Sequence, residues 1–133
     1  MRTLLLLVGD SDLLKSLRLT LGEYNLIEAT TAEQALRLFV DNGRYIDLLL
    51  IDVSAGSAGL RVAMFLRSEI RNLPVVVMAG YPVDSWTVRD SVDLQRLGTN
   101  STVISKPFQP DALAKLVQGL LQSRPPNPPR FRS

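Results

Sequence analysis

The sequence of 133 residues contains no cysteine and no histidine. The absence of cysteine excludes disulfide bonds, thiolate catalysis and cysteine-ligated metal sites, and it is typical of a reducing compartment, so we expect a cytoplasmic protein. The absence of histidine excludes imidazole acid–base catalysis, histidine-ligated metals and a role as phosphohistidine donor. Any phosphoryl or metal chemistry must therefore use carboxylates, lysine, hydroxyl groups and the backbone.

Long hydrophobic runs and a strong charge of one sign are also lacking. The run Thr3–Val8 is six residues long, whereas a membrane-spanning helix needs about twenty, so we expect no membrane segment. The formal net charge is +2, but Arg124, Arg130 and Arg132 stand in the last ten residues, where there is no acid. Residues 1–123 hold 12 basic and 13 acidic residues, which argues against binding to nucleic acid.

The length and the 46% of hydrophobic residues fit one globular domain, which we predict over residues 1–122. Five short apolar runs recur along it: Thr3–Val8, Asn25–Ala29, Ile46–Ile51, Pro74–Met78 and Thr102–Ile104. Continuous runs of this kind are typical of parallel strands that are buried on both faces. Residues 123–133 are rich in proline and arginine and predict an extended, flexible tail.

Between these runs, apolar residues recur with the period of helices that pack against a core. The four clear stripes are Leu13, Leu14, Leu17 and Leu21; Ala32, Ala35, Leu36, Phe39 and Val40; Val62, Ala63, Leu66 and Ile70; and Leu113, Leu116, Val117, Leu120 and Leu121. Ser11 or Asp12 is expected to cap the first helix, Thr31 to cap the second, and Pro110 to begin the last. A weaker pattern predicts a further helix within residues 84–97.

The order of elements is a strand followed by a helix, five times over. Right-handed crossovers then give an α/β fold, a doubly wound parallel sheet of five strands in the order 2-1-3-4-5 with helices on both faces. In such a sheet, ligands bind at the carboxyl ends of strands 1 and 3.

Charged residues follow the predicted strands at this edge. Asp10 follows the first strand, Asp52 the third and Lys106 the fifth. Two neighbouring carboxylates repel each other unless a cation lies between them, and Mg²⁺ accepts one or two carboxylates while keeping several waters. A nearby lysine supplies a positive charge for a phosphoryl oxygen. The pattern is typical of an aspartate that accepts a phosphoryl group.

Four motifs at these positions resemble the receiver domains of two-component response regulators, which have a CheY-like, flavodoxin-like fold. They are Leu-Leu-Val-Gly-Asp-Ser-Asp at 6–12, Ile-Asp-Leu-Leu-Leu-Ile-Asp-Val at 46–53, Leu-Pro-Val-Val-Val-Met-Ala-Gly-Tyr at 73–81 and Ser-Lys-Pro-Phe-Gln-Pro-Asp-Ala-Leu at 105–113. The resemblance covers residues 3–122. The third motif is similar to receivers at the carboxyl ends of hybrid sensor kinases, so the chain is either a single-domain receiver or part of a larger protein.

The resemblance implies a role for each residue at the strand ends. Asp52 would be the phosphoacceptor, Lys106 would pair with the phosphoryl group, and the Lys106–Pro107 peptide would be cis. Asp10, Asp52 and the backbone carbonyl of Ser54 would bind Mg²⁺. The implied partner is a sensor histidine kinase or a phosphotransfer protein, with dimerisation left open, and the chain would be a signalling module rather than an enzyme.

The chain departs from the family pattern at four places. Receivers usually carry two adjacent acids after the first strand, and here the first is Gly9, so we expect weak Mg²⁺ binding. The hydroxyl residue of the fourth strand is Ala79, and the aromatic residue three positions before the lysine is Val103. The loop after Asp52 is one residue shorter before Gly59 than the family pattern. With Ala79 and Val103, the usual response to phosphorylation is expected to be lost.

Several alternatives therefore stay open. The chain could be a pseudo-receiver that acts as a phosphorylation-independent interaction module, or a flavodoxin-like ligand binder. Residues 56–59 form either a phosphate-binding loop for a nucleotide or flavin or a flexible turn. Asp10 could cap the first helix, and Asp12 could substitute for the missing acid. Asp52 and Lys106 could be a turn aspartate and a solvated lysine. Tyr81 and Trp86 form either a partner-binding patch or a cover over the sheet edge.

Overall fold

The computed structural model describes residues 2–52, 58–80 and 101–122. Five strands form one parallel sheet in the order β2-β1-β3-β4-β5, which confirms the predicted fold class and strand order. The strands are β1 (Thr3–Leu7), β2 (Asn25–Ala29), β3 (Leu48–Asp52), β4 (Val75–Ala79) and β5 (Ser101–Ser105). Each predicted apolar run contains or overlaps one of them.

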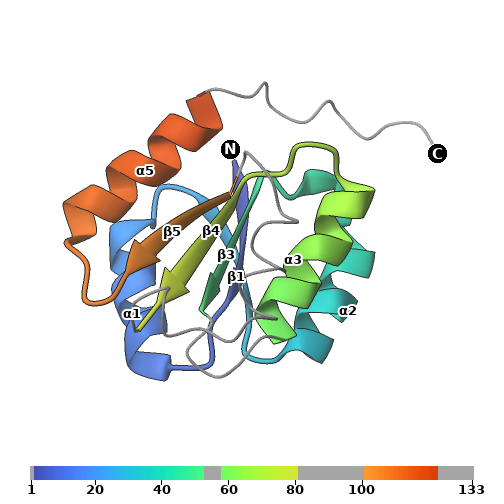
Figure 1. The fold of residues 1–133 in the computed structure, drawn as a ribbon, viewed down its shortest axis with the longest axis horizontal. Helices are drawn as coiled ribbons and strands as arrows, with labels where there is room; N and C mark the ends of the chain where they lie inside the picture. Colours follow the sequence, from blue (N-terminus) through green and yellow to red (C-terminus); the bar gives the residue numbers. More distant parts are fainter. Residues whose placement is uncertain (1, 53–57, 81–100, 123–133) are drawn as a thin grey trace.

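Helices cover both faces of the sheet (Figure 1). The helices are α1 (Ser11–Thr20), α2 (Ala32–Asn42), α3 (Ala58–Glu69) and α5 (Pro110–Gln122), with a short 3-10 helix η1 (Gly43–Tyr45) that the sequence did not predict. α1 and α5 lie on one face, and α2 and α3 lie on the other. In the described ranges, none of the helices has both the length and the hydropathy needed to cross a bilayer. The predicted helix within 84–97 and the tail 123–133 lie outside the described residues.

Two hydrophobic clusters flank the sheet, because successive residues of a strand point to opposite faces. Leu5 and Leu7 of β1 join the cluster under α2 and α3, whereas Leu4 and Leu6 join the cluster under α1 and α5. All four side chains are at most 6% exposed. This burial on both faces explains why the central strands read as continuous apolar runs.

The buried face of α2 differs from the predicted stripe. Val40 is 79% exposed and Leu36 is 37% exposed, although both were expected to be buried. Ala35 is buried and Phe39 packs against the same cluster, as expected, and Leu38, which the stripe did not include, packs there too. The prediction was wrong because the α2 sequence carries two overlapping apolar stripes, and packing against α3 and the sheet decides which one is covered.

A polar cluster joins the ends of the described domain at the amino edge of the sheet. Asp47 is buried, and its Oδ2 accepts a hydrogen bond of 2.8 Å from the backbone N–H of Thr3. Nη1 of Arg2 lies 3.9 Å from Oδ1 of Asp47, and Nη2 of Arg2 donates to the carbonyl of Leu121 at 2.9 Å. The cluster therefore connects β1, the start of β3 and the end of α5.

Candidate functional site

Charged side chains gather at the carboxyl edge of the sheet. Asp52 is the last residue of β3, and Lys106 follows β5 directly. Asp10 follows β1 after Val8 and Gly9 and directly precedes α1. Because all five strands are parallel, their carboxyl ends share one edge, and the three predicted site residues lie there as the sequence indicated.

Asp52 and Lys106 form a shielded ion pair across 54 residues of sequence. Nζ of Lys106 donates to Oδ1 of Asp52 at 2.9 Å, and the side chains of Lys106 and Asp52 are 21% and 5% exposed. The backbone N–H of Lys106 donates to the carbonyl of Ala79 at 2.7 Å. The Lys106–Pro107 peptide is cis, as predicted. Lys106 is therefore not a solvated lysine, and its charge is directed at one carboxylate.

Asp10 is the N-cap of α1. Its Oδ1 accepts hydrogen bonds from the backbone N–H groups of Asp12 at 2.9 Å and Leu13 at 3.3 Å. The expectation that Ser11 or Asp12 caps this helix was wrong, because the helix begins at Ser11 and the extended backbone needed at a cap occurs at Asp10. Both hydrogen bonds are accepted by Oδ1, so in the described part of the chain the cap does not use Oδ2.

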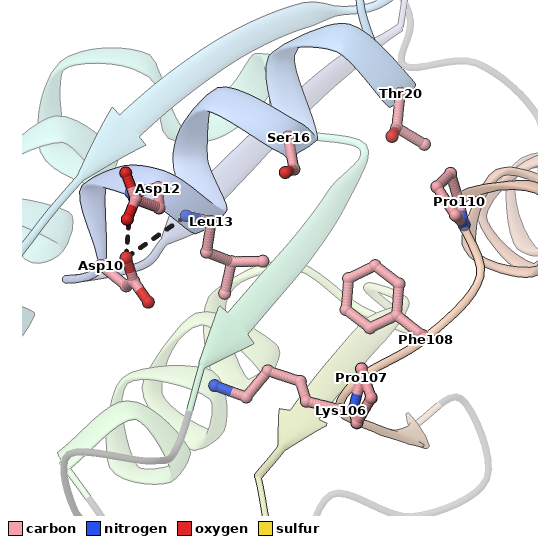
Figure 2. A pocket seen from close by; sticks show the side chains of 9 residues that line it. All are labelled: Asp10, Asp12, Leu13, Ser16, Thr20, Lys106, Pro107, Phe108 and Pro110. Atoms are coloured by element: carbon pink, nitrogen blue, oxygen red, sulfur yellow. Dashed lines mark hydrogen bonds between the residues drawn. The ribbon is translucent and has the colours of Figure 1, made fainter.

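A groove runs from the site between α1 and the segment that joins β5 to α5. It has a volume of about 460 Å³, within the range of small-ligand sites. Its lining comes from α1 and its cap on one wall and from the β5–α5 segment on the other: Asp10, Asp12, Leu13, Ser16, Thr20, Lys106, Pro107, Phe108 and Pro110. Figure 2 shows Lys106 reaching from this wall to the end of β3. We call this groove the α1–α5 groove.

The donor set at this edge can be compared with the requirements of Mg²⁺, which the family resemblance implies. Mg²⁺ takes one or two carboxylates and keeps several waters, and Asp10 and Asp52 supply two carboxylates at the same edge of the sheet. Within the described residues, no cluster of three or more potential metal-ligating side chains occurs. The two carboxylates match the donor chemistry that Mg²⁺ prefers, and they are the residues that would hold the ion. Ser54, the third expected ligand, lies outside the described residues.

The departures from the family pattern have distinct structural settings. Among the described residues, the nearest atom to a Cβ at Gly9 would be the carbonyl oxygen of Thr30, at 3.6 Å, so these residues leave space for a side chain there. Ala79 is fully buried at the end of β4 and carries no hydrogen-bonding side chain. Val103 is half-buried on β5 and packs against the cluster under α2 and α3. The end of β4 therefore offers the site only backbone groups.

The expectation of a flexible turn at residues 56–59 was wrong for its second half, and the alternative of a phosphate-binding loop stays a prediction. Ala58 and Gly59 form the start of α3, and Gly59 is buried. A Cβ at Gly59 would lie 3.7 Å from the side chain of Ile51 and 3.8 Å from that of Leu7. This glycine therefore lets α3 approach the sheet closely. The first half of the loop, Tyr81 and Trp86 lie outside the described residues.

The sequence did not reveal the groove. Leu13 was assigned only to the buried face of the first helix, yet it is half-buried and lines the groove wall. Phe108 was noted only as part of a motif, and it packs against the cluster under α1 and α5 while facing the groove. The signal that could have revealed it is the spacing of Leu13, Ser16 and Thr20, which places them along one side of a helix.

No family model and no curated protein matches this chain. Solved structures do match it. A response regulator receiver domain protein from Clostridium thermocellum has a TM-score of 0.76 at 16% identity, covering 92% of this chain and 96% of that one. A CheY-like receiver domain protein from Methanospirillum hungatei has a TM-score of 0.76 at 20% identity, with coverages of 92% and 95%.

A response regulator receiver protein from Sinorhizobium medicae has a TM-score of 0.74 at 24% identity, covering 92% of this chain and 95% of that one. These comparisons span almost all of both chains. At such low identity they establish the architecture and leave the chemistry to be argued from the residues. The chain has the fold of CheY-like response regulator receiver domains.

Proposed function

We propose that this chain, which has the receiver fold, accepts a phosphoryl group on Asp52 from a phosphohistidine of a sensor kinase or phosphotransfer protein. The observation that carries the proposal is the ion pair between Lys106 and Asp52 at the carboxyl edge of the sheet. A lysine that points at one carboxylate from a separate strand is what phosphoryl transfer needs, because negative charge develops on the transferred group.

In the proposed reaction, a carboxylate oxygen of Asp52 attacks the phosphorus of the phosphohistidine. The new P–O bond forms as the P–N bond breaks, and the bonding electron pair leaves with the imidazole nitrogen, which then takes a proton from solvent. Lys106 stabilises the charge on the phosphoryl oxygens. Its backbone hydrogen bond to Ala79 fixes the point from which the amine reaches the site.

Asp10 and Asp52 are the residues that would hold Mg²⁺, with the carbonyl of Ser54 proposed as a third ligand. The ion would neutralise charge on the phosphoryl oxygens as they approach the carboxylate. Asp10 would do this with one carboxylate oxygen while the other caps α1. Because Gly9 supplies no second acid, we expect the affinity of the site for Mg²⁺ to be low.

The α1–α5 groove supports the position proposed for the phosphodonor. A phosphohistidine must come within bonding distance of Asp52, and the groove opens beside Lys106, which contacts that residue. The groove combines an apolar wall at Leu13 and Phe108 with acids at Asp10 and Asp12. Such a surface fits a protein segment that carries apolar and basic side chains.

Mass spectrometry after incubation with acetyl phosphate and Mg²⁺ tests the proposal. We expect one phosphoryl adduct, which is lost in Asp52→Asn and kept in Asp41→Asn, a matched change on the exposed face of α2. The proposal fails if no adduct forms with either acetyl phosphate or a phosphorylated phosphotransfer domain, or if Asp52→Asn leaves the adduct in place.

The second candidate is a phosphorylation-independent interaction module with the same fold. Ala79 favours it, because the end of β4 has no side chain that could bind a phosphoryl oxygen. In this case beryllofluoride with Mg²⁺ would leave the amide spectrum of the protein unchanged. Sedimentation velocity over a range of concentrations would show whether the module pairs with a second copy.

A further inference from the structure

Lys106 belongs both to the ion pair with Asp52 and to the α1–α5 groove. Its amine contacts Asp52, and its side chain, together with Pro107 and Phe108, forms one wall of the α1–α5 groove. Figure 2 shows the side chain running from that wall to the end of β3. A chemical change at Asp52 therefore acts on Lys106, which is also a residue of the groove wall.

The backbone of Lys106 is held more firmly than its side chain. Its N–H donates to the carbonyl of Ala79 at 2.7 Å, and the preceding residue, Ser105, pairs with Ala79 in the sheet. The lysine side chain has four rotatable bonds and is 21% exposed. We therefore expect a displacement of the amine to move the lysine side chain and the groove residues beside it, and to leave β5 in place.

Phosphorylation of Asp52 would move the negative charge with which the Lys106 amine pairs. A phosphoryl group carries a charge of about −1.5 to −2, and its oxygens lie beyond the original carboxylate. The amine can keep its ion pair only by moving with those oxygens. On β4, the fully buried Ala79 has no polar side-chain group that could respond, and Val103 on β5 is apolar.

We propose that Lys106 transmits the state of Asp52 to the α1–α5 groove, so that this groove is the surface that reports modification of the site. Lys106 then acts as a positioning residue for Phe108 and Pro107 in addition to stabilising the phosphoryl group. The inference rests on the proposed function for its biological use. The coupling itself requires only the ion pair and can be measured without phosphorylation.

A double-mutant cycle read by amide NMR of the full chain tests the coupling. Asp52→Asn removes the charge that holds the amine, so we expect the amide signals of Leu13, Ser16 and Phe108 to shift. In the Lys106→Gln background the same Asp52→Asn change should leave these signals in place. Lys115→Gln, an exposed change on α5, is the matched control and should preserve the response.

Equal shifts in both backgrounds, or no shift at these amides in either, would overturn the inference. If Lys106→Gln does not fold, Lys106→Met keeps most of the length of the side chain without its charge and has the same two outcomes. Acetyl phosphate gives a separate arm. An adduct on Asp52 that leaves the groove signals unmoved overturns the inference alone, whereas absence of the adduct counts against the proposed function alone.

Discussion

Nζ of Lys106 and Oδ1 of Asp52 lie 2.9 Å apart, with the carboxylate shielded from solvent and the amine partly open. Removing the lysine takes one cation away from a buried carboxylate, whereas removing both charges does not leave that charge behind. We predict that Lys106→Gln lowers the free energy of unfolding by about 1–3 kcal/mol, because the Asp52 carboxylate loses a hydrogen-bond partner, and that Asp52→Asn in the same chain restores much of it. Urea denaturation of the four proteins measures the coupling, and additive effects would contradict it.

Asp10 has two roles that substitution can separate. Asp10→Ala removes the cap of α1 and should cost about 1 kcal/mol in the free energy of unfolding, whereas Asp10→Ser keeps a capping oxygen and should cost less. Both changes remove the proposed Mg²⁺ ligand. Thermal unfolding should therefore distinguish the two variants while calorimetric titration with Mg²⁺ finds both equally impaired. A Ser variant that binds Mg²⁺ as well as the parent would exclude Asp10 as a ligand.

Gly9 is the position where one substitution should strengthen metal binding. The described residues leave room for a Cβ, whose nearest neighbour among them would be the Thr30 carbonyl at 3.6 Å. An added carboxylate beside Asp10 raises the negative charge of the site, so we predict that Gly9→Asp increases Mg²⁺ affinity roughly tenfold. Calorimetric titration measures this. Gly9→Asn is the control of equal size without charge and should bind as the parent does.

Asp47 stabilises the amino edge of the sheet from a buried position. Asp47→Ala leaves the N–H of Thr3 without its side-chain acceptor, which should cost about 2 kcal/mol in the free energy of unfolding. Asp47→Asn can keep that hydrogen bond and should cost less. Urea denaturation ranks the variants. Equal losses would show that the charge beside Arg2, and not the hydrogen bond, is what matters.

The ion pair between Arg18 and Glu28 should make stability depend on pH. Hydrogen bonding to Arg18 holds the pKa of the Glu28 carboxyl below its ordinary value, despite an opposing effect of burial. A lowered pKa in the folded state means that the stabilisation is present above the unfolded pKa and is lost as pH falls through the folded value.

We therefore predict that Glu28→Gln lowers the urea midpoint at pH 7, and that the difference from the parent begins to shrink near the ordinary glutamate pKa of about 4.3 and disappears once the pH is below the lowered pKa of the folded state. High salt should reduce the difference at pH 7, because both side chains are partly exposed. Glu33→Gln, on an exposed pair within α2, is the control and should have a smaller effect. A difference that persists at low pH would exclude the ion pair as its cause.

The sheet was predictable because apolar runs such as Thr3–Val8 are too short for anything but buried strands, and their alternation with helical stripes leaves few topologies. The meeting of Asp52 with Lys106 followed from that topology. The capping residue did not, because Asp10, Ser11 and Asp12 are all good caps and only backbone geometry selects one. The exposure of Val40 also depends on packing between helices, which a single stripe does not encode.

The hydrogen bond from Arg2 to the carbonyl of Leu121 joins positions 119 apart in sequence, so the folded unit begins and ends at the same place (Figure 1). A short peptide linker could therefore close the chain into a ring, and new ends could be opened in a surface turn between other elements. The same proximity allows domain insertion into a surface loop of another protein, because the two ends of that loop can stay close together.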